Sequence, residues 1–204
     1  MAVRLSASGL AVMRGERLLF RDVEFALGAG DCLVVEGKNG AGKTSLLRVV
    51  AGLLPATDGD VCWDGVSIRR AGQSYRASLA WYGHRPGLKR DLTPLENLHA
   101  ESALRPPGTR QLGDTLERLG IAALTTLPVG VLSAGQQRRV ALARLVLSSA
   151  PLWLMDEPFT NLDRGGQALV NELVAEHIGG GGLCMLASHR DVDPALPTGR
   201  ISLS

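Results

Sequence analysis

The chain has 204 residues, of which 45% are hydrophobic and 21% are charged, and its 25 glycines show no Gly-X-Y repeat. This length and composition predict one domain or a compact two-lobed unit, and they exclude a mainly disordered chain and a collagen-like helix. Lys and Arg total 22 against 20 Asp and Glu, with no dense basic tract, so the charge gives no support to nucleic-acid binding.

Membrane-spanning and disulfide-rich classes also lack support. The longest charge-free stretch, residues 119–137, is interrupted by Thr, Ser, Pro and Gln, so no segment is suited to spanning a bilayer. The cysteines Cys32, Cys62 and Cys184 are far apart and have neither metal-ligand spacing nor the pattern of a disulfide framework. We expect them to be small core residues in a reducing, cytosolic compartment.

The first third of the chain has the pattern of short strands joined by turns. Residues 5–13 form a short segment with Ser and Gly, which predicts a strand rather than a signal peptide. Apolar residues at helical spacing predict a helix over residues 44–54, ended by Pro55. Further strands are predicted over residues 23–27, 32–35 and 61–63, with Gly- and Asp-rich turns between them.

The rest of the chain has first the pattern of consecutive helices and then that of strands alternating with a helix. Between about residues 92 and 144, helices are predicted over residues 94–101, 109–119 and 134–147. Residues 152–155 and 183–187 are continuous apolar runs, typical of parallel strands buried on both faces, and a helix is predicted between them over residues 166–178. These elements predict an α/β core interrupted by a helical insertion.

A glycine-rich segment between a predicted strand and a predicted helix carries the most specific motif. Residues 37–44 read Gly-Lys-Asn-Gly-Ala-Gly-Lys-Thr and match the G-x-x-x-x-G-K-[ST] pattern of a phosphate-binding loop. Glycines let backbone N–H groups point at phosphate oxygens, and the helix N-terminus adds partial positive charge. Lys43 is expected to bridge the β- and γ-phosphates, and the Thr44 hydroxyl to bind Mg²⁺. The nucleotide-binding residues predicted here are Gly37, Lys38, Asn39, Gly40, Ala41, Gly42, Lys43, Thr44 and Ser45.

Two acids follow the predicted strand 152–155. Asp156 and Glu157 would then lie at the carboxyl edge of a parallel sheet, where α/β proteins bind their ligands. We expect Asp156 to hold Mg²⁺ through its water shell and Glu157 to polarise the attacking water. Adjacent strand residues point to opposite faces, so presenting both acids requires the chain to turn here, before Pro158. Together with the phosphate loop, the two acids predict a nucleotide-hydrolysis site.

A third motif lies at the start of the predicted helix 134–147. Residues 132–138, Leu-Ser-Ala-Gly-Gln-Gln-Arg, resemble the LSGGQ signature of ATP-binding-cassette (ABC) ATPases, with Ala134 in place of one glycine. Ser133 is suited to cap the helix, and Gly135 allows close backbone approach. In this family the signature of one subunit covers the γ-phosphate held by another. The resemblance therefore implies that Ser133, Ala134, Gly135 and Gln136 bind ATP across a head-to-tail homodimer.

Two more segments follow the order of the ABC family. Residues 160–163, Thr-Asn-Leu-Asp, resemble the loop that carries signals across the dimer, and His189 lies where the family's switch histidine contacts the γ-phosphate. The chain is therefore identified as a member of the family. This implies a P-loop NTPase (RecA-like) α/β core with an N-terminal antiparallel β lobe and a helical insertion lobe. In one domain of residues 1–204, the core and β lobe would cover about residues 1–87 and 147–204, and the helical lobe about residues 88–146.

Two positions depart from the family pattern. His84 stands where the family has a glutamine that senses Mg²⁺ and the membrane partner, and we assign it a catalytic role on that correspondence. Arg14 stands where an aromatic side chain usually stacks on adenine, a contact that a planar guanidinium also makes. If Arg14 were instead a solvated surface residue, adenine binding would be weaker.

Residues 81–89 and the Glu36-Gly37 opening narrow the resemblance to the ATP-binding subunit of the haem exporter of bacterial cytochrome c maturation. This implies ATP and Mg²⁺ as cofactors and transmembrane ABC subunits as partners, with a coupling helix docked near residues 84–89. It also implies a peripheral place on the cytoplasmic face of the bacterial inner membrane. Haem would be handled by the partners and not bound directly. Whether haem itself is transported, or ATP powers release of a haem-loaded chaperone, stays open.

Three alternatives also stay open. They are an ABC transporter ATPase for a different cargo, a soluble ABC ATPase acting on ribosomes or DNA, and a nucleotide-binding regulator without turnover. The soluble class usually joins two cassettes in one chain or carries long coiled coils, and this sequence shows neither feature. The presence of Glu157 and His189 disfavours the regulator.

Residues outside the motifs receive structural roles. His99 and His177 lie beside polar neighbours in predicted helices, and we expect both to face solvent. Trp63, Trp81 and Trp153 are expected to pack in the core rather than to bind haem.

Overall fold

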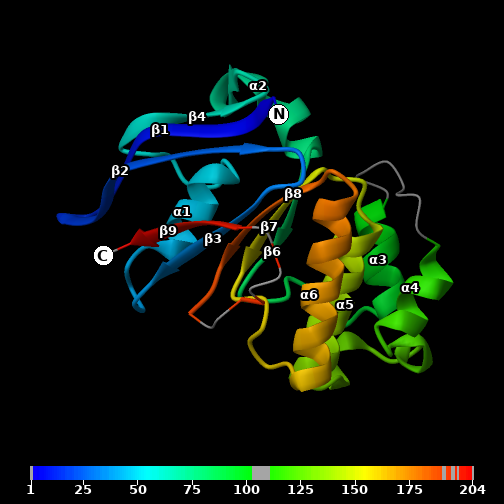
Figure 1. Ribbon diagram of the computed structural model, residues 1–204. Helices are drawn as coiled ribbons and strands as arrows, with labels where there is room; N and C mark the ends of the chain where they lie inside the picture. The colour runs from blue at the N-terminus through cyan, green and yellow to red at the C-terminus, as the bar shows by residue number, and fades with distance from the viewer. Residues whose placement is uncertain (1, 103–110, 190–191, 194–195, 197, 204) are drawn as a thin grey trace.

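A computed structural model describes residues 2–102, 111–189, 192–193, 196 and 198–203. The described chain forms an antiparallel sheet, a parallel sheet and two groups of helices (Figure 1). The predicted α/β architecture, with a β layer at the N-terminus and helices inserted in the middle of the chain, is confirmed.

The antiparallel sheet is built from the N-terminal part of the chain in the order β2-β1-β4-β5. Its strands are β1 (Val3–Arg14), β2 (Arg17–Gly28), β4 (Asp58–Trp63) and β5 (Val66–Ser67). β2 is longer than the segment 23–27 predicted for it, because its N-terminal half pairs with β1 across a tight turn at Gly15. The exposed face of this hairpin carries polar residues, so the N-terminal half of β2 has no continuous apolar run that would predict a strand.

The parallel sheet has the order β6-β7-β8-β3-β9. Its strands are β3 (Cys32–Gly37), β6 (Leu79–Tyr82), β7 (Leu152–Asp156), β8 (Leu183–Ala187) and β9 (Thr198–Leu203). Every residue of β7 and β8 is buried, as their continuous apolar sequences predicted. β6 and β9 had no prediction, since they are short and lack a clear apolar pattern.

The two faces of the parallel sheet bury different helices. One face packs on α1 (Lys43–Val50), which lies between the two sheets, with α2 (Ile68–Ala77) at the edge of the upper layer (Figure 1). The other face packs on α5 (Ala134–Leu147) and α6 (Arg164–Gly179). Beside α5 lie α3 (Pro94–Ser102) and α4 (Leu112–Arg118). Alternate residues of β7 and β8 enter the two cores, which is why residues 152–155 and 183–187 are all apolar.

The predicted helix 44–54 ends earlier than expected. α1 stops at Val50, and Gly52 has a positive φ of 68°. The N–H groups of Gly52, Leu53 and Leu54 turn back to carbonyl oxygens of the last helical turn. A glycine in this conformation closes a helix, so Gly52 and not Pro55 is the stop signal. Part of the predicted helix 109–119 lies outside the described residues.

Candidate functional site

The phosphate loop connects β3 to α1 directly. Gly40 and Gly42 have φ angles of +84° and +101°, which only glycine adopts without strain. The Lys43 side chain is 7% exposed, and its Nζ donates hydrogen bonds to the carbonyl oxygens of Gly37 and Lys38 at 2.7 and 3.3 Å. The lysine charge is thus held over the loop, where an anion would replace the carbonyl oxygens as its partner.

The Thr44 hydroxyl and the Asp156 carboxylate meet at the carboxyl edge of the parallel sheet. Thr44 Oγ1 donates to Asp156, at 2.9 Å from Oδ1 and 3.0 Å from Oδ2. Asp156 is 2% exposed, and burial raises the pKa of its carboxyl group, with the Thr44 hydrogen bond opposing the shift. Two adjacent oxygen donors, one of them anionic, fit Mg²⁺, which binds proteins through one or two such groups plus phosphates and water.

Glu157 and His189 form a second contact beside this pair. Glu157 has a φ of +52°, so the chain turns sharply after β7, and its side chain lines a pocket together with Thr44, the partner of the Asp156 carboxylate. Its Oε2 is 2.7 Å from Nδ1 of His189, which follows β8. The turn that the sequence required in order to present both acids is therefore made by the backbone of Glu157 itself.

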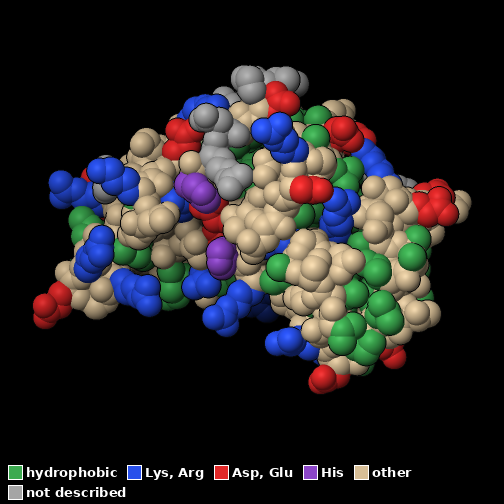
Figure 2. Space-filling view, turned by 90° about the horizontal axis from the view of Figure 1, so that it is seen from below, with side chains coloured by type: hydrophobic (Ala, Val, Ile, Leu, Met, Phe, Trp, Pro, Cys, Tyr) green, Lys and Arg blue, Asp and Glu red, His purple; other side chains and the backbone are tan. Residues whose placement is uncertain are grey.

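A pocket of ≈ 460 Å³ collects most of the predicted site residues from distant parts of the chain. Leu19, which the sequence analysis missed, also lines it, from β2, and Thr160 lines it beside Glu157. The predicted residues that line it are Arg14, Asn39, Gly40, Gly42, Lys43, Thr44, Ser45, His84, Glu157 and His189. Figure 2 shows Lys, Arg and His side chains gathered on the left half of one face, where they favour an anionic ligand.

The segment of residues 133–136 does not line this pocket. Ser133 caps α5, since the Gln136 N–H donates to its Oγ at 3.2 Å while Gln136 Oε1 accepts from the Ser133 N–H at 2.9 Å. Ser133 and Ala134 are exposed, and a Cβ at Gly135 would lie 3.3 Å from the Asn161 carbonyl oxygen. The helix N-terminus is thus open to a ligand outside its own chain's pocket.

His177 corrects an expectation from the sequence. It does not simply face solvent, because its ring stacks on Trp153 with centroids 3.9 Å apart and an interplanar angle of 6°. Its Nε2 lies 3.1 and 3.2 Å from the carbonyl oxygens of Pro151 and Leu183, so it carries the proton and donates to both. His177 therefore connects α6 to two strands of the parallel sheet.

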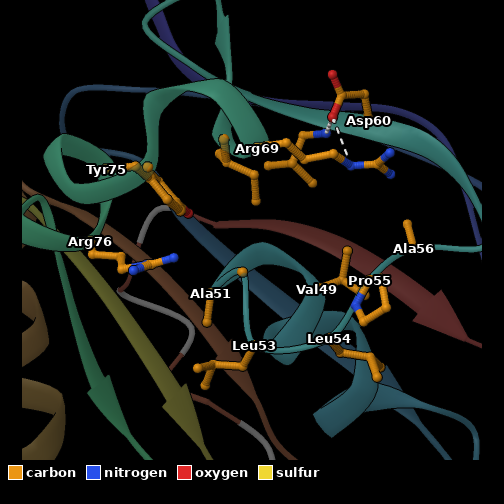
Figure 3. Close-up of a pocket in the computed structure, with 14 residues that line it drawn as sticks. Val49, Ala51, Leu53, Leu54, Pro55, Ala56, Asp60, Arg69, Tyr75 and Arg76 are labelled. Atoms are coloured by element: carbon orange, nitrogen blue, oxygen red, sulfur yellow. Dashed lines mark hydrogen bonds and ion pairs between the residues drawn. The ribbon is translucent and has the colours of Figure 1, made fainter.

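A second groove, of ≈ 400 Å³, lies between the end of α1, β4 and α2. Figure 3 shows Leu53, Leu54 and Pro55 on one side of it and Tyr75 and Arg76 on the other. None of the residues predicted to bind nucleotide lines this groove. Its walls combine apolar side chains with the charged Asp60, Arg69 and Arg76.

Comparisons with known proteins agree with the geometry. A family model described as ABC transporter matches residues 20–160. The cytochrome c biogenesis ATP-binding export protein CcmA of Methylococcus capsulatus is 47% identical over 191 residues, which cover 93% of this chain and 92% of that protein. The protein of the same name from Haemophilus influenzae is 44% identical over 191 residues, covering 93% and 90%.

Solved structures show the same fold. The ATP-binding subunit of an ABC transporter has a TM-score of 0.84 at 24% identity and covers 91% of this chain and 79% of its own. A putative ABC transporter ATP-binding protein from Pyrococcus furiosus has a TM-score of 0.83 at 22% identity, covering 97% and 96%. In the part of the chain that the structure describes, no helix has the length and apolarity needed to cross a membrane.

Proposed function

Since this chain belongs to the ABC transporter family, we propose that it is the ATP-hydrolysing subunit of an export complex for cytochrome c biogenesis. Relatives named cytochrome c biogenesis ATP-binding export protein CcmA are 44–47% identical to this chain over most of their length. The observation that carries the catalytic part of the proposal is the meeting of the phosphate loop, Glu157 and His189 around one pocket, with Asp156 hydrogen-bonded to Thr44 of that loop.

The residues of this pocket have different roles in ATP hydrolysis. Backbone N–H groups of the phosphate loop and Lys43 bind the phosphates and neutralise their charge. Glu157 accepts a hydrogen bond from the attacking water and orients it, while His189 holds the Glu157 carboxylate in position and faces the terminal phosphate. Arg14 lies in the same pocket and offers a planar face to the adenine ring.

Thr44 and Asp156 are the groups that would hold Mg²⁺. Their oxygens already lie within hydrogen-bond distance of each other, and within the described residues no group of three or more His, Cys, Asp and Glu side chains forms a metal cage. A bound Mg²⁺ would neutralise charge on the phosphate oxygens. Ionised Asp156 is costly in its buried position, so a divalent cation there would also stabilise the carboxylate.

The proposal includes partners that one chain does not supply. The segment 133–136, whose first two residues are exposed, would cover the ATP of a second copy packed head to tail, so one chain alone would hydrolyse slowly. The chain would divide into a core at about residues 1–87 and 147–204 and a helical lobe at about residues 88–146.

Membrane subunits would contact residues 84–89 from the cytoplasmic face of the inner membrane and would handle haem themselves. His84, which lies in the nucleotide pocket, would then respond to both the membrane subunits and ATP.

The test is Glu157→Gln, with Glu172→Gln as the matched control. Glu172 lies on α6, is 63% exposed and pairs with Arg118, so its loss leaves the pocket intact. We expect the Glu157→Gln protein to bind ATP normally and to hydrolyse it about a hundredfold or more slowly. Cells carrying only this variant, at normal protein level, should lose covalent haem staining of all c-type cytochromes while other haem proteins stay intact.

Three results would count against the proposal. Unimpaired hydrolysis by the Glu157→Gln protein would exclude Glu157 as the catalytic carboxylate. Normal haem staining with a stalled ATPase would leave an ABC transporter ATPase for a different cargo. Recovery of the protein with ribosomes or DNA instead of membranes would favour the soluble class.

A further inference from the structure

Helix α5 is attached to the loop that carries His84 by two arginines. Arg138 Nη1 donates to the Gly83 carbonyl oxygen at 2.9 Å, and Nη2 donates to the carbonyl oxygen of His84. One turn and a half further along, Arg144 Nη1 donates to the carbonyl oxygens of Pro86 and Gly87 at 3.2 and 3.1 Å. The loop of residues 83–87 is thus held through its backbone by side chains of a single helix.

Arg138 is the more constrained of the two arginines. It is 2% exposed, and its guanidinium lies 5.4 Å from the centre of the Tyr82 ring, at the end of β6. A guanidinium stays charged when buried, so its N–H groups must all find acceptors or aromatic faces. Its planar fork spans two successive carbonyl oxygens, a geometry that the single ammonium of lysine does not reproduce. Burying a full charge to hold two backbone carbonyls is costly, and that cost points to a positioning role.

The Arg138 connection joins two parts of the proposed ATP-binding site. His84 lines the nucleotide pocket with Glu157 and His189. The N-terminus of α5, one turn before Arg138, carries the partly exposed segment 133–136, which we assign to the ATP of a second copy. A short, rigid path of hydrogen bonds therefore joins a chain's own pocket to the segment that completes the other pocket.

We propose that Arg138 is a positioning residue that locks the His84 loop to α5, so that His84 and the segment 133–136 move as one unit. ATP in one pocket then sets where the segment 133–136 lies for the other. This inference rests on the proposed ATP hydrolysis by paired chains. Loss of the lock leaves ATP binding by a single chain intact, because Arg138 does not line the pocket, but misplaces the group that completes the paired site.

The test compares Arg138→Lys and Arg138→Met with the wild-type full chain and with Arg118→Met. Arg118 is the matched control, since it pairs with Glu172 and Glu176 on α6 and does not touch the loop. ATP affinity is measured with a fluorescent ATP analogue on dilute chain, and kcat and KM from steady-state hydrolysis at high chain concentration. Thermal unfolding of each variant shows that it is folded.

For Arg138→Met we expect ATP affinity within about twofold of wild type and a kcat lowered about tenfold. Arg138→Lys keeps the charge but has a single donor nitrogen in place of the two that bind the loop, so it should recover part of the lost kcat. Arg118→Met should match wild type in both quantities.

Three results would overturn the role of Arg138. These are a wild-type kcat in the folded Arg138→Met protein, a parallel loss of affinity and kcat, and unfolding of both Arg138 variants, which would show a purely structural role. Failure of the proposed function appears separately, as continued hydrolysis by the Glu157→Gln protein.

Discussion

The buried carboxylate of Asp156 links the stability of this fold to its activity. The side chain is 2% exposed, and its pKa is raised mainly by burial and further by the charge of Glu157, against the hydrogen bond from Thr44. At neutral pH the folded state therefore holds an ionised group that would be better solvated in the unfolded chain. Asp156→Asn removes this charge and keeps the shape, so the free energy of unfolding should rise by on the order of 1 kcal/mol at pH 7.

The same shift gives the direction of the pH dependence. Between the unfolded-state pKa of about 3.9 and the raised pKa of the folded state, folded wild-type protein binds more protons than unfolded protein. The contribution of Asp156 to stability thus falls as pH rises through this window and stays constant above it. Asparagine does not titrate. The stability advantage of Asp156→Asn should be full at neutral pH and disappear toward about pH 3.

Urea unfolding of nucleotide-free protein at pH 7 and at a series of lower pH values measures this difference. Asp91→Asn is the control, because Asp91 is exposed and its change should stay within about 0.5 kcal/mol. The Asp156→Asn protein should also lose the stabilisation that Mg²⁺ with ATP gives to wild type. Equal stability of the two proteins at pH 7, or an advantage that persists at acid pH, would refute the reasoning.

Two further substitutions test contacts that support the site. Gly37→Ala should cost about 2–4 kcal/mol of unfolding free energy in urea, because its Cβ would lie 2.5 Å from the Leu203 carbonyl oxygen at a φ of +146°. Gly40→Ala is the control, since the space at its Cβ is open, and it should cost only about 1 kcal/mol. Equal costs for the two substitutions would contradict the contact at Gly37. His177→Ala should cost about 1–3 kcal/mol in the same assay, since it loses the Trp153 stack and the imidazole N–H shared by two carbonyl oxygens, of which that of Pro151 keeps the Leu183 N–H. An unchanged midpoint would show that the stack adds nothing.

The predictions that agree with the structure rest on motifs that lie within short segments of the chain. The phosphate loop needs a strand, a run of glycines and a helix in one segment, and all three are contiguous from residue 32 to residue 50. The cap formed by Ser133 and Gln136 spans four residues, and the apolar runs 152–155 and 183–187 indicate burial on both faces. Each of these features is decided by interactions within one short segment, so each is readable from the sequence.

Several elements escaped the sequence analysis because their cause is not local. β9 has no distinctive pattern, yet it pairs with β3 along its length and reaches Gly37 at the phosphate loop. The solvent-facing prediction for His177 was wrong because the ring packs on Trp153, which precedes it by more than twenty residues. Polar neighbours in a helix indicate exposure on average and say nothing of a ring that turns toward the sheet.

The amino-acid sequence by itself indicated the ABC family and predicted a phosphate loop and the acids for hydrolysis, because those groups come in contiguous motifs. Only the tertiary structure brought Arg14, His84, Glu157 and His189 to one pocket and set Arg138 against the loop at residues 83–87. The meeting of His84, Glu157 and His189 depends on the strand order β6-β7-β8-β3-β9, because they follow β6, β7 and β8, while Arg14 comes from the end of β1 in the other sheet. That order comes from long-range packing of both faces of the sheet, which local periodicity does not encode.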